Sequence, residues 1–198
     1  MCSETRPNAK PETVGWHCKR PYQKMENLIK IGNNFYDLES KHFSLKIGNS
    51  FKEVEHLFSL RHFTRLLSAN FSDSDLNDEG LFILSDFLEI YNLNLQNTQI
   101  TNEGTEYLKR LKNLKYLRLK ENPQLTNECI SNLIEIKSLQ DLQIHETSVT
   151  EEGLRKVAIL KNLRDITLDV REGNYSFGGL MKLSIEIPNC NILAKGDG

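Results

Sequence analysis

The chain has 198 residues, of which 38% are hydrophobic and 26% are charged, and its formal net charge is −2 at pH 7. This composition is typical of a single folded domain, and it argues against a disordered chain or a membrane protein. The near-neutral charge gives no general attraction to nucleic acid or anionic lipid, so we expect neither as a partner.

Residues 1–21 are predicted to form a polar N-terminal arm, because they contain three prolines and lack the apolar core of a secretory signal. We therefore expect a cytoplasmic protein. If a signal peptide had been removed before Cys2, the protein would instead be periplasmic or lipid-anchored at that cysteine. The cysteines form no CxxC pair, so we expect reduced thiols and no metal site, with a Cys2–Cys18 disulfide as the alternative in an exported form.

Residues 22–41 precede the regular part of the sequence and are predicted to be an N-terminal cap. An end segment of this kind is needed where an apolar core would otherwise be open to water. Its first part, YQKMENLIKI (residues 22–31), is expected to form a helix.

Residues 42–170 contain an internal repeat. Apolar residues recur at offsets 0, 3, 5 and 10 of a unit that is 24 or 25 residues long. The clear units begin at Leu66, Ile90, Leu114, Leu139 and Leu163. An earlier unit is less regular, and its strand is predicted to contain Leu45 and Ile47. Such coincident columns indicate one supersecondary structure that is copied along the chain.

Three units read IYNLNLQNTQI (residues 90–100), LKYLRLKENPQL (114–125) and LQDLQIHETSV (139–149). They resemble the leucine-rich repeat family, whose unit is L-x-x-L-x-L-x-x-N/C-x-L, and the resemblance covers about residues 42–187. It implies an α/β solenoid, a right-handed β–α superhelix with a short parallel sheet on its concave face and helices on its convex face. The family's Asn/Cys position holds Ser74, Thr98, Asn122 and Thr147, whose hydroxyl or amide groups can bond the backbone at the bend.

Each unit is predicted to continue from its strand through a turn into a helix. The segments TNEG (101–104) and TEEG (150–153) are typical helix starts, with Thr as the N-cap and acidic residues in the first turn. Gly80, Gly104 and Gly153 share one column, in which Cys129 replaces glycine. The small residues in this column indicate close approach to the neighbouring unit.

Residues 171–198 are predicted to be a C-terminal cap. Leu180, Leu183 and Ile185 repeat the strand spacing, while DVREGNYSFGG (169–179) is short and rich in glycine. We therefore expect a turn followed by a closing strand over residues 180–185.

The outward positions of the strands are the candidate binding site. Residues two, four and six places after the start of each unit should lie on the face opposite the helices. With one flanking residue, the candidates are Tyr91, Asn92, Asn94, Gln96, Tyr116, Arg118, Lys120, Asp141, Gln143, His145, Asp165 and Asp169. They change along the stack from amides to a basic cluster and then to acids. Arg118 and Lys120 should face Gln143 and His145, so the sequence predicts a basic patch that is not neutralised by the adjacent strand.

Two other interpretations of the surface remain open. The strand residues could be polar only because they face water. The contact could also lie on the convex helices, which carry Lys109, Arg110, Lys112, Arg155 and Lys156.

The resemblance favours a non-enzymatic protein-binding module that is monomeric when free. The sequence has no P-loop, GxSxG, HExxH or Rossmann glycine motif, so we assign no catalytic, cofactor or metal site. One expected role is a specific inhibitor, such as the immunity partner of a bacterial toxin, and the other is an adaptor or host-directed effector. An enzyme is a remote alternative, because no catalytic motif is present. A nucleic-acid binder is equally remote, because Asp141, Asp165 and Asp169 would repel phosphates.

Overall fold

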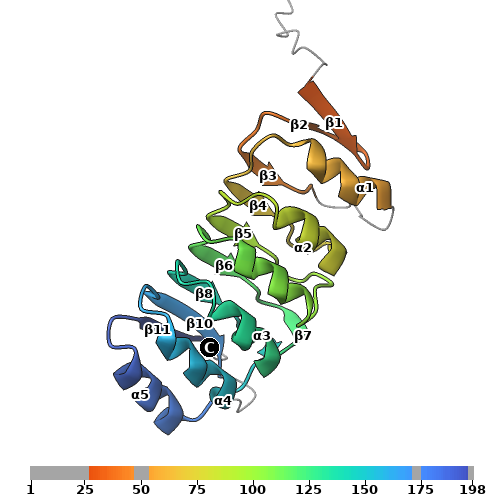
Figure 1. Ribbon diagram of the computed structural model, residues 1–198. Helices are drawn as coiled ribbons and strands as arrows, with labels where there is room; N and C mark the ends of the chain where they lie inside the picture. Colours follow the sequence, from red (N-terminus) through yellow and green to blue (C-terminus); the bar gives the residue numbers. More distant parts are fainter. Residues whose placement is uncertain (1–26, 47–53, 171–174, 196–198) are drawn as a thin grey trace, which may run out of the picture.

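The computed structural model describes residues 27–46, 54–170 and 175–195. In this part of the chain, strands and short helices alternate and stack along one direction, with the strands on one side and the helices on the other (Figure 1). The prediction of a parallel sheet with helices is confirmed. The predictions for the N-terminal arm, including Cys2 and Cys18, lie outside the described residues.

The described chain begins with a β-hairpin, where the sequence predicted a helix over residues 22–31. Strands β1 (Leu28–Ile31) and β2 (Asn34–Asp37) pair antiparallel, so the prediction is wrong for the last four of these residues, and residues 22–26 lie outside the described part. The two-residue loop contains Gly32, whose φ of 57° suits glycine at the first position of a tight hairpin turn. Ile31 and Tyr36 are buried and close the N-terminal end of the core.

The main sheet has seven parallel strands in the spatial order β11-β10-β8-β6-β5-β4-β3. The strands are β3 (His42–Ser44), β4 (Ser68–Asn70), β5 (Asn92–Asn94), β6 (Tyr116–Arg118), β8 (Asp141–Gln143), β10 (Asp165–Asp169) and β11 (Asn191–Lys195). A second, two-stranded parallel sheet joins β7 (Asn122–Thr126) to β9 (Thr147–Ser148).

The return segments between these strands are short helices on one side of the sheet (Figure 1). The α-helices are α1 (Val54–Ser59), α2 (Asp78–Leu84), α3 (Asn127–Leu133), α4 (Glu151–Leu154) and α5 (Phe177–Glu186). The 3₁₀ helices are η2 (Leu60–His62), η3 (Gly104–Arg110) and η4 (Arg155–Ile159). The core lies between the sheet and the helices, and the residues that begin the predicted units, from Leu66 to Leu163, are all buried there.

The first unit is shifted by two residues from the predicted register. Phe43, rather than Leu45, pairs with Ala69 in the sheet and is buried. Its ring stacks on Phe71, with the ring centroids 5.0 Å apart, and meets Phe63 edge-on at 5.3 Å. Aromatic packing therefore favours the register in which Phe43 pairs with Ala69. The other predicted strand residue, Ile47, lies outside the described residues.

The C-terminal segment is a helix followed by a strand, so the predicted strand over residues 180–185 is wrong. Ser176 caps α5 by accepting a hydrogen bond from the Gly179 N–H at 2.9 Å. Leu183 and Ile187 are buried at helical spacing, while Ile185 is exposed. The strand that extends the sheet is β11, which pairs with β10 over five residues.

Side chains at the family's Asn/Cys position bond the backbone at the bend, as predicted. The hydroxyls of Ser74, Thr98 and Thr147 each donate to the carbonyl three residues earlier, at 2.6, 3.0 and 2.6 Å. Asn122 does more, because its Nδ2 donates to Leu119 O at 2.9 Å and also to Leu95 O of the preceding unit at 2.8 Å.

A ladder of side chains joins each helix start to the next unit. Asp78, Asn102 and Asn127 each accept a hydrogen bond from the backbone N–H of Thr101, Thr126 and Thr150, respectively, at 2.8–3.0 Å, and each also bonds that residue's hydroxyl. Glu151 binds the Ser176 N–H and hydroxyl in the same way. The helix start predicted at Thr150 is confirmed, because Thr150 is the N-cap residue of α4, although its side chain makes no cap bond and instead accepts from Asn127 Nδ2. The prediction is wrong for Thr101, because the N-cap of η3 is Glu103.

This ladder explains the glycine column. A Cβ atom at Gly104 would overlap the Asp78 carboxylate, and one at Gly153 would overlap the Asn127 side chain. The predicted close approach to the neighbouring unit is confirmed at both positions.

Candidate functional site

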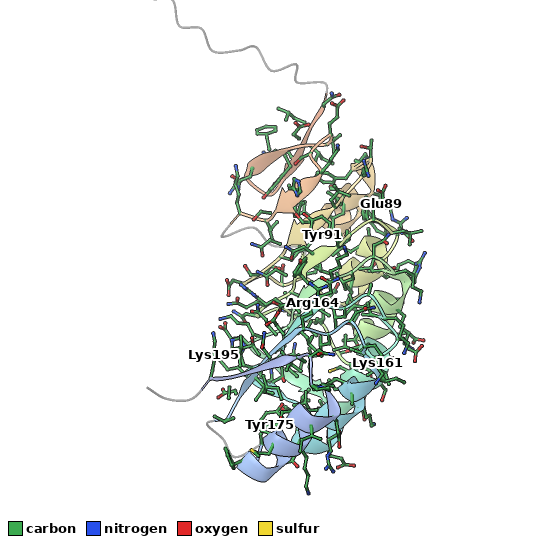
Figure 2. The ribbon with its side chains drawn as sticks, turned by 90° about the vertical axis from the view of Figure 1, so that its left-hand side faces the viewer. Glu89, Tyr91, Lys161, Arg164, Tyr175 and Lys195 are labelled. Carbon is green, nitrogen blue, oxygen red and sulfur yellow. The ribbon has the colours of Figure 1, made fainter. Side chains whose placement is uncertain are left out.

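We call the side of the seven-stranded sheet that faces away from the helices the open face. Strand pairing places its outward residues in two rows, because register partners on neighbouring parallel strands lie side by side. The first row is His42, Ser68, Asn92, Tyr116, Asp141, Asp165 and Asn191. The second row is Ser44, Asn70, Asn94, Arg118, Gln143, Thr167 and Leu193. Figure 2 views the molecule from the strand side.

A hollow of about 490 Å³ lies on the open face, over strands β3 to β8. Six of the predicted candidates line it: Asn92, Asn94, Tyr116, Arg118, Asp141 and Gln143. The structure thus brings the middle of the predicted set together around one depression. Asp165 lies beside this hollow, as the register partner of Asp141 on β10.

The hollow also contains residues that the sequence analysis missed. His42 lines it at the N-terminal end, where its Nδ1 is hydrogen-bonded to the Ser68 hydroxyl at 2.8 Å. Ser44 and Asn70 lie beside them in the second row. The two-residue register error in the first unit hid His42, and the aromatic residue next to it, Phe43, was the signal that could have revealed the correct register.

Tyr116 is the large aromatic side chain of the hollow, and 42% of its surface is exposed. Tyr91, labelled in Figure 2, supports it in an edge-to-face arrangement, with the ring centroids 6.3 Å apart and the planes at 75°. A ring that is held by a neighbour loses little conformational entropy when a ligand packs against it, and tyrosine is enriched at interaction hot spots.

The basic patch is smaller than predicted. Lys120 Nζ forms an ion pair with Glu121 Oε1 at 2.6 Å, and Glu121 also accepts a hydrogen bond from Gln96 Nε2 at 3.1 Å. The bond from Lys120 lowers the pKa of the Glu121 carboxyl. Lys120 is therefore neutralised by the next residue of its own chain segment rather than by the adjacent strand, and the sequence analysis did not anticipate this pair. Arg118 forms no ion pair with any residue in the described part of the chain, and it is the free cation of the hollow.

The acidic part of the face begins with two neighbouring carboxylates. Asp141 and Asp165 are register partners on β8 and β10. Asp165 Oδ1 accepts a hydrogen bond from Asn191 Nδ2 at 2.8 Å, whereas Gln143 Nε2 reaches Asp141 Oδ1 only at 3.5 Å. Burial raises the pKa of Asp141, and the negative charge of Asp165 raises it further, against the opposing effects of the Gln143 hydrogen bond and the charge of Arg118. Asp169 lies farther along β10, in register with Lys195.

His145 does not fit the predicted binding face. It is only 2% exposed, so the prediction of an accessible contact residue is wrong for this position. Its Nδ1 is buried and has no hydrogen-bond partner among the residues that the structure describes. Burial lowers the pKa of His145, and the positive charges of Lys195 and Lys120 lower it further. These effects favour the neutral form of the side chain, which is buried just after strand β8.

The amide side chains serve the fold as well as the surface. Asn94 Oδ1 accepts a hydrogen bond from the Gln96 N–H at 3.1 Å, and Asn70 Oδ1 accepts one from the Ser72 N–H at 3.0 Å. Each of these bonds closes the turn that follows a strand, as asparagine commonly does.

The opposite, helical side offers fewer free charges than its composition indicates. Arg110 is paired with Asp86 at 2.7 Å, and Lys109 lies 3.6 Å from Glu106. Lys112, Arg155 and Lys156 are exposed.

The two cysteines in the described ranges are free thiols. Burial raises the pKa of Cys129 to about 12 and that of Cys190 to about 11, so neither thiol is activated. Within the described ranges, no three His, Cys, Asp or Glu side chains gather to hold a metal ion. No described helix is long and apolar enough to cross a membrane.

No protein-family model matches the sequence, and a search of curated proteins finds no match. Among solved structures, the chain is similar to an internalin from Listeria monocytogenes strain 4b F2365, with a TM-score of 0.51 and 17% sequence identity. The match covers 83% of this chain and 52% of that protein, so this chain spans about half the length of the internalin. At this identity the likeness concerns the fold, and the fold that the two chains share is of the leucine-rich repeat type.

Proposed function

We propose that this chain is a non-enzymatic protein-interaction module that binds a protein partner on the open face. In this proposal the stack is a right-handed solenoid, and the open face is its concave side. The observation that carries the proposal is the hollow of about 490 Å³. It combines the exposed ring of Tyr116, the carboxylate of Asp141, and the cation of Arg118, which forms no ion pair within the described ranges. Arginine and tyrosine are the residue types that contribute most to hot spots.

The proposed site is narrower than the set predicted from the sequence. It keeps Asn92, Asn94, Tyr116, Arg118, Asp141, Gln143 and Asp165, adds His42, and leaves out the buried His145. Tyr91 contributes by supporting Tyr116. Gln96 and Lys120 are held by Glu121 at the margin of the face, and Asp169 lies beyond the hollow.

Within this class, a specific inhibitor is the role we favour, for example an immunity protein that covers the charged active site of a bacterial toxin in the cytoplasm. An arginine next to an acidic pair on one face, Arg118 beside Asp141 and Asp165, is suited to a partner of complementary charge, and such patterns determine specificity and association rate. An adaptor or effector that recruits a target protein is the alternative role.

The test is partner capture from a lysate of the native source, followed by mass spectrometry. Wild type is compared with Tyr116→Ala/Arg118→Glu on the open face and with Lys112→Glu/Lys156→Glu on the helical side as a matched control. We expect the open-face variant to lose the partner and the control to retain it. A partner that is retained by the open-face variant and lost by the control would place the contact on the helices and refute the proposal. A captured toxic enzyme favours the inhibitor, and a ligase or secretion component favours the adaptor.

A further inference from the structure

Three neighbouring side chains in the first row of the open face share one property: each can bind a cation. Tyr116, Asp141 and Asp165 are register partners on the consecutive strands β6, β8 and β10. Adjacent strands lie about 4.8 Å apart, so a ring and two carboxylates line up within the reach of one long side chain.

Neither carboxylate forms an ion pair within the part of the chain that the structure describes, although the charge of Arg118 acts on Asp141. None of the ion pairs within residues 27–46, 54–170 and 175–195 involves Asp141 or Asp165, and both accept hydrogen bonds from neutral amides only, those of Gln143 and Asn191. Like charges directly opposite each other on neighbouring strands destabilise a sheet. Burial is the main cause of the raised pKa of Asp141, and the charge of Asp165 adds to it. A positive charge from outside would reduce the repulsion between the two carboxylates.

The neighbouring groups determine what kind of cation fits. Tyr116 presents an exposed ring at the edge of the hollow, where a Lys or Arg side chain can pack against its face. A guanidinium group can bind carboxylate oxygens in pairs and stack on an aromatic ring at the same time. In the second row, Arg118 lies next to Gln143 and is free to bind a carboxylate.

Resting on the proposed function, we infer that the open face binds a polypeptide segment of the partner whose Lys or Arg side chain lies between Tyr116 and the Asp141–Asp165 pair. An acidic residue of the same segment binds Arg118. The partner is thus recognised through a basic and an acidic side chain that lie close together, rather than through a uniformly charged surface.

A displayed library of random linear peptides, selected on the wild-type protein in the presence of EDTA, tests this inference. EDTA prevents a divalent metal ion from bridging the carboxylates. We expect sequences that contain Lys or Arg to be enriched on wild type, and the enrichment to disappear on Asp141→Asn/Asp165→Asn. Both substitutions preserve shape and can keep the amide bonds, and equal or higher thermal midpoints confirm that the variant is folded.

A double-mutant cycle then locates the basic residue. The best selected peptide is labelled, and its Kd is measured by fluorescence anisotropy with and without its Lys or Arg replaced by Gln. We expect this replacement to weaken binding to wild type at least about tenfold, and to have little effect on the Asp141→Asn/Asp165→Asn variant. An equal loss on both proteins would overturn the inference, because the basic residue would then bind elsewhere.

The outcomes separate the inference from the proposed function. If peptides without basic residues are selected and their binding is lost in Tyr116→Ala, the open face is the binding site but its occupant is not a basic segment. If selected peptides bind Tyr116→Ala/Arg118→Glu as tightly as wild type, both the inference and the open-face proposal fail. If the library yields no binder, the inference fails, because a linear segment is then not recognised, while partner capture still tests the open face.

Discussion

Asn122 should contribute more to stability than any hydroxyl at the equivalent position of the other units, and Asn122→Ala tests this. The side chain is completely buried. Its Oδ1 accepts from the Thr98 N–H at 3.0 Å, and its Nδ2 donates to Leu119 O at 2.9 Å and to Leu95 O at 2.8 Å.

The magnitude follows from the groups that the substitution leaves without a bond. Leu95 O retains the bond from the Thr98 hydroxyl at 3.0 Å, so the Thr98 N–H and Leu119 O are the two groups affected. A buried polar group that loses its partner costs about 1–3 kcal/mol. We therefore expect Asn122→Ala to lower the free energy of unfolding by about 2–6 kcal/mol.

Thr147→Val is the matched control at the same position of the next unit. The Thr147 hydroxyl donates to Ile144 O at 2.6 Å and accepts a long bond from the Val149 N–H at 3.5 Å, and the residue is only partly buried. Because water can replace part of this bond, we expect a loss of about 1 kcal/mol. Urea unfolding followed by circular dichroism measures both variants, with an unchanged m value showing that the midpoint shift reports stability. If the two variants agree within about 0.5 kcal/mol, the argument that Asn122 links two units is refuted.

Three further predictions concern the packing and the buried histidine. Gly104→Ala should displace the Asp78 carboxylate from its bonds, and we expect a lower thermal midpoint than for Gly178→Ala, where a Cβ atom meets nothing within 4 Å. Leu117→Ala, in the middle of β6, should cost about 2–5 kcal/mol in urea unfolding, because it opens a cavity in the core. The pKa of His145 is lower in the folded state than in the unfolded chain, so the unfolded state binds a proton more readily. Stability should therefore fall as the pH decreases below about 6.5, and less steeply in His145→Gln, as pH-dependent thermal scans can show.

The periodic part of the fold is predictable from the sequence, because a residue that enters the core must be apolar in every unit. The middle position of each strand accepts only an apolar side chain. It holds Leu93, Leu117 and Leu142, and all three are buried as expected. The ends carry no such repetition. At the C-terminal end, the three-residue spacing of Leu180 and Leu183 is compatible with both a strand and a helix, and the burial of Ile187 decides for the helix.

The candidate site was predicted only in part, since strand alternation gives the face on which a side chain lies but not its neighbours. The pairing of Lys120 illustrates this. Glu121 has a left-handed backbone with φ of 58°, as do Asp73, Asn97 and Glu146 at the equivalent positions of other units. This sharp turn brings Glu121 back towards Lys120, and alternation along an extended strand does not describe it.

The lowered pKa of His145 illustrates a different reason, because part of it depends on a residue that is distant in the sequence. The charge of Lys195, at the end of β11, acts on the histidine from 50 positions further along the chain. The sequence analysis had placed the closing strand elsewhere, so it had no reason to expect this environment.

The ladder that starts at Asp78 and ends at Ser176 makes this chain modular in a way that protein engineering can use. Each inner unit supplies a hydroxyl to the unit before it and an amide or carboxylate to the unit after it. A whole unit, such as residues 101–125, therefore carries both halves of the connection and could be duplicated without leaving either half unmatched. Such a duplication would lengthen the open face by one strand. Inserting only part of a unit would leave a donor or an acceptor of the ladder without its partner.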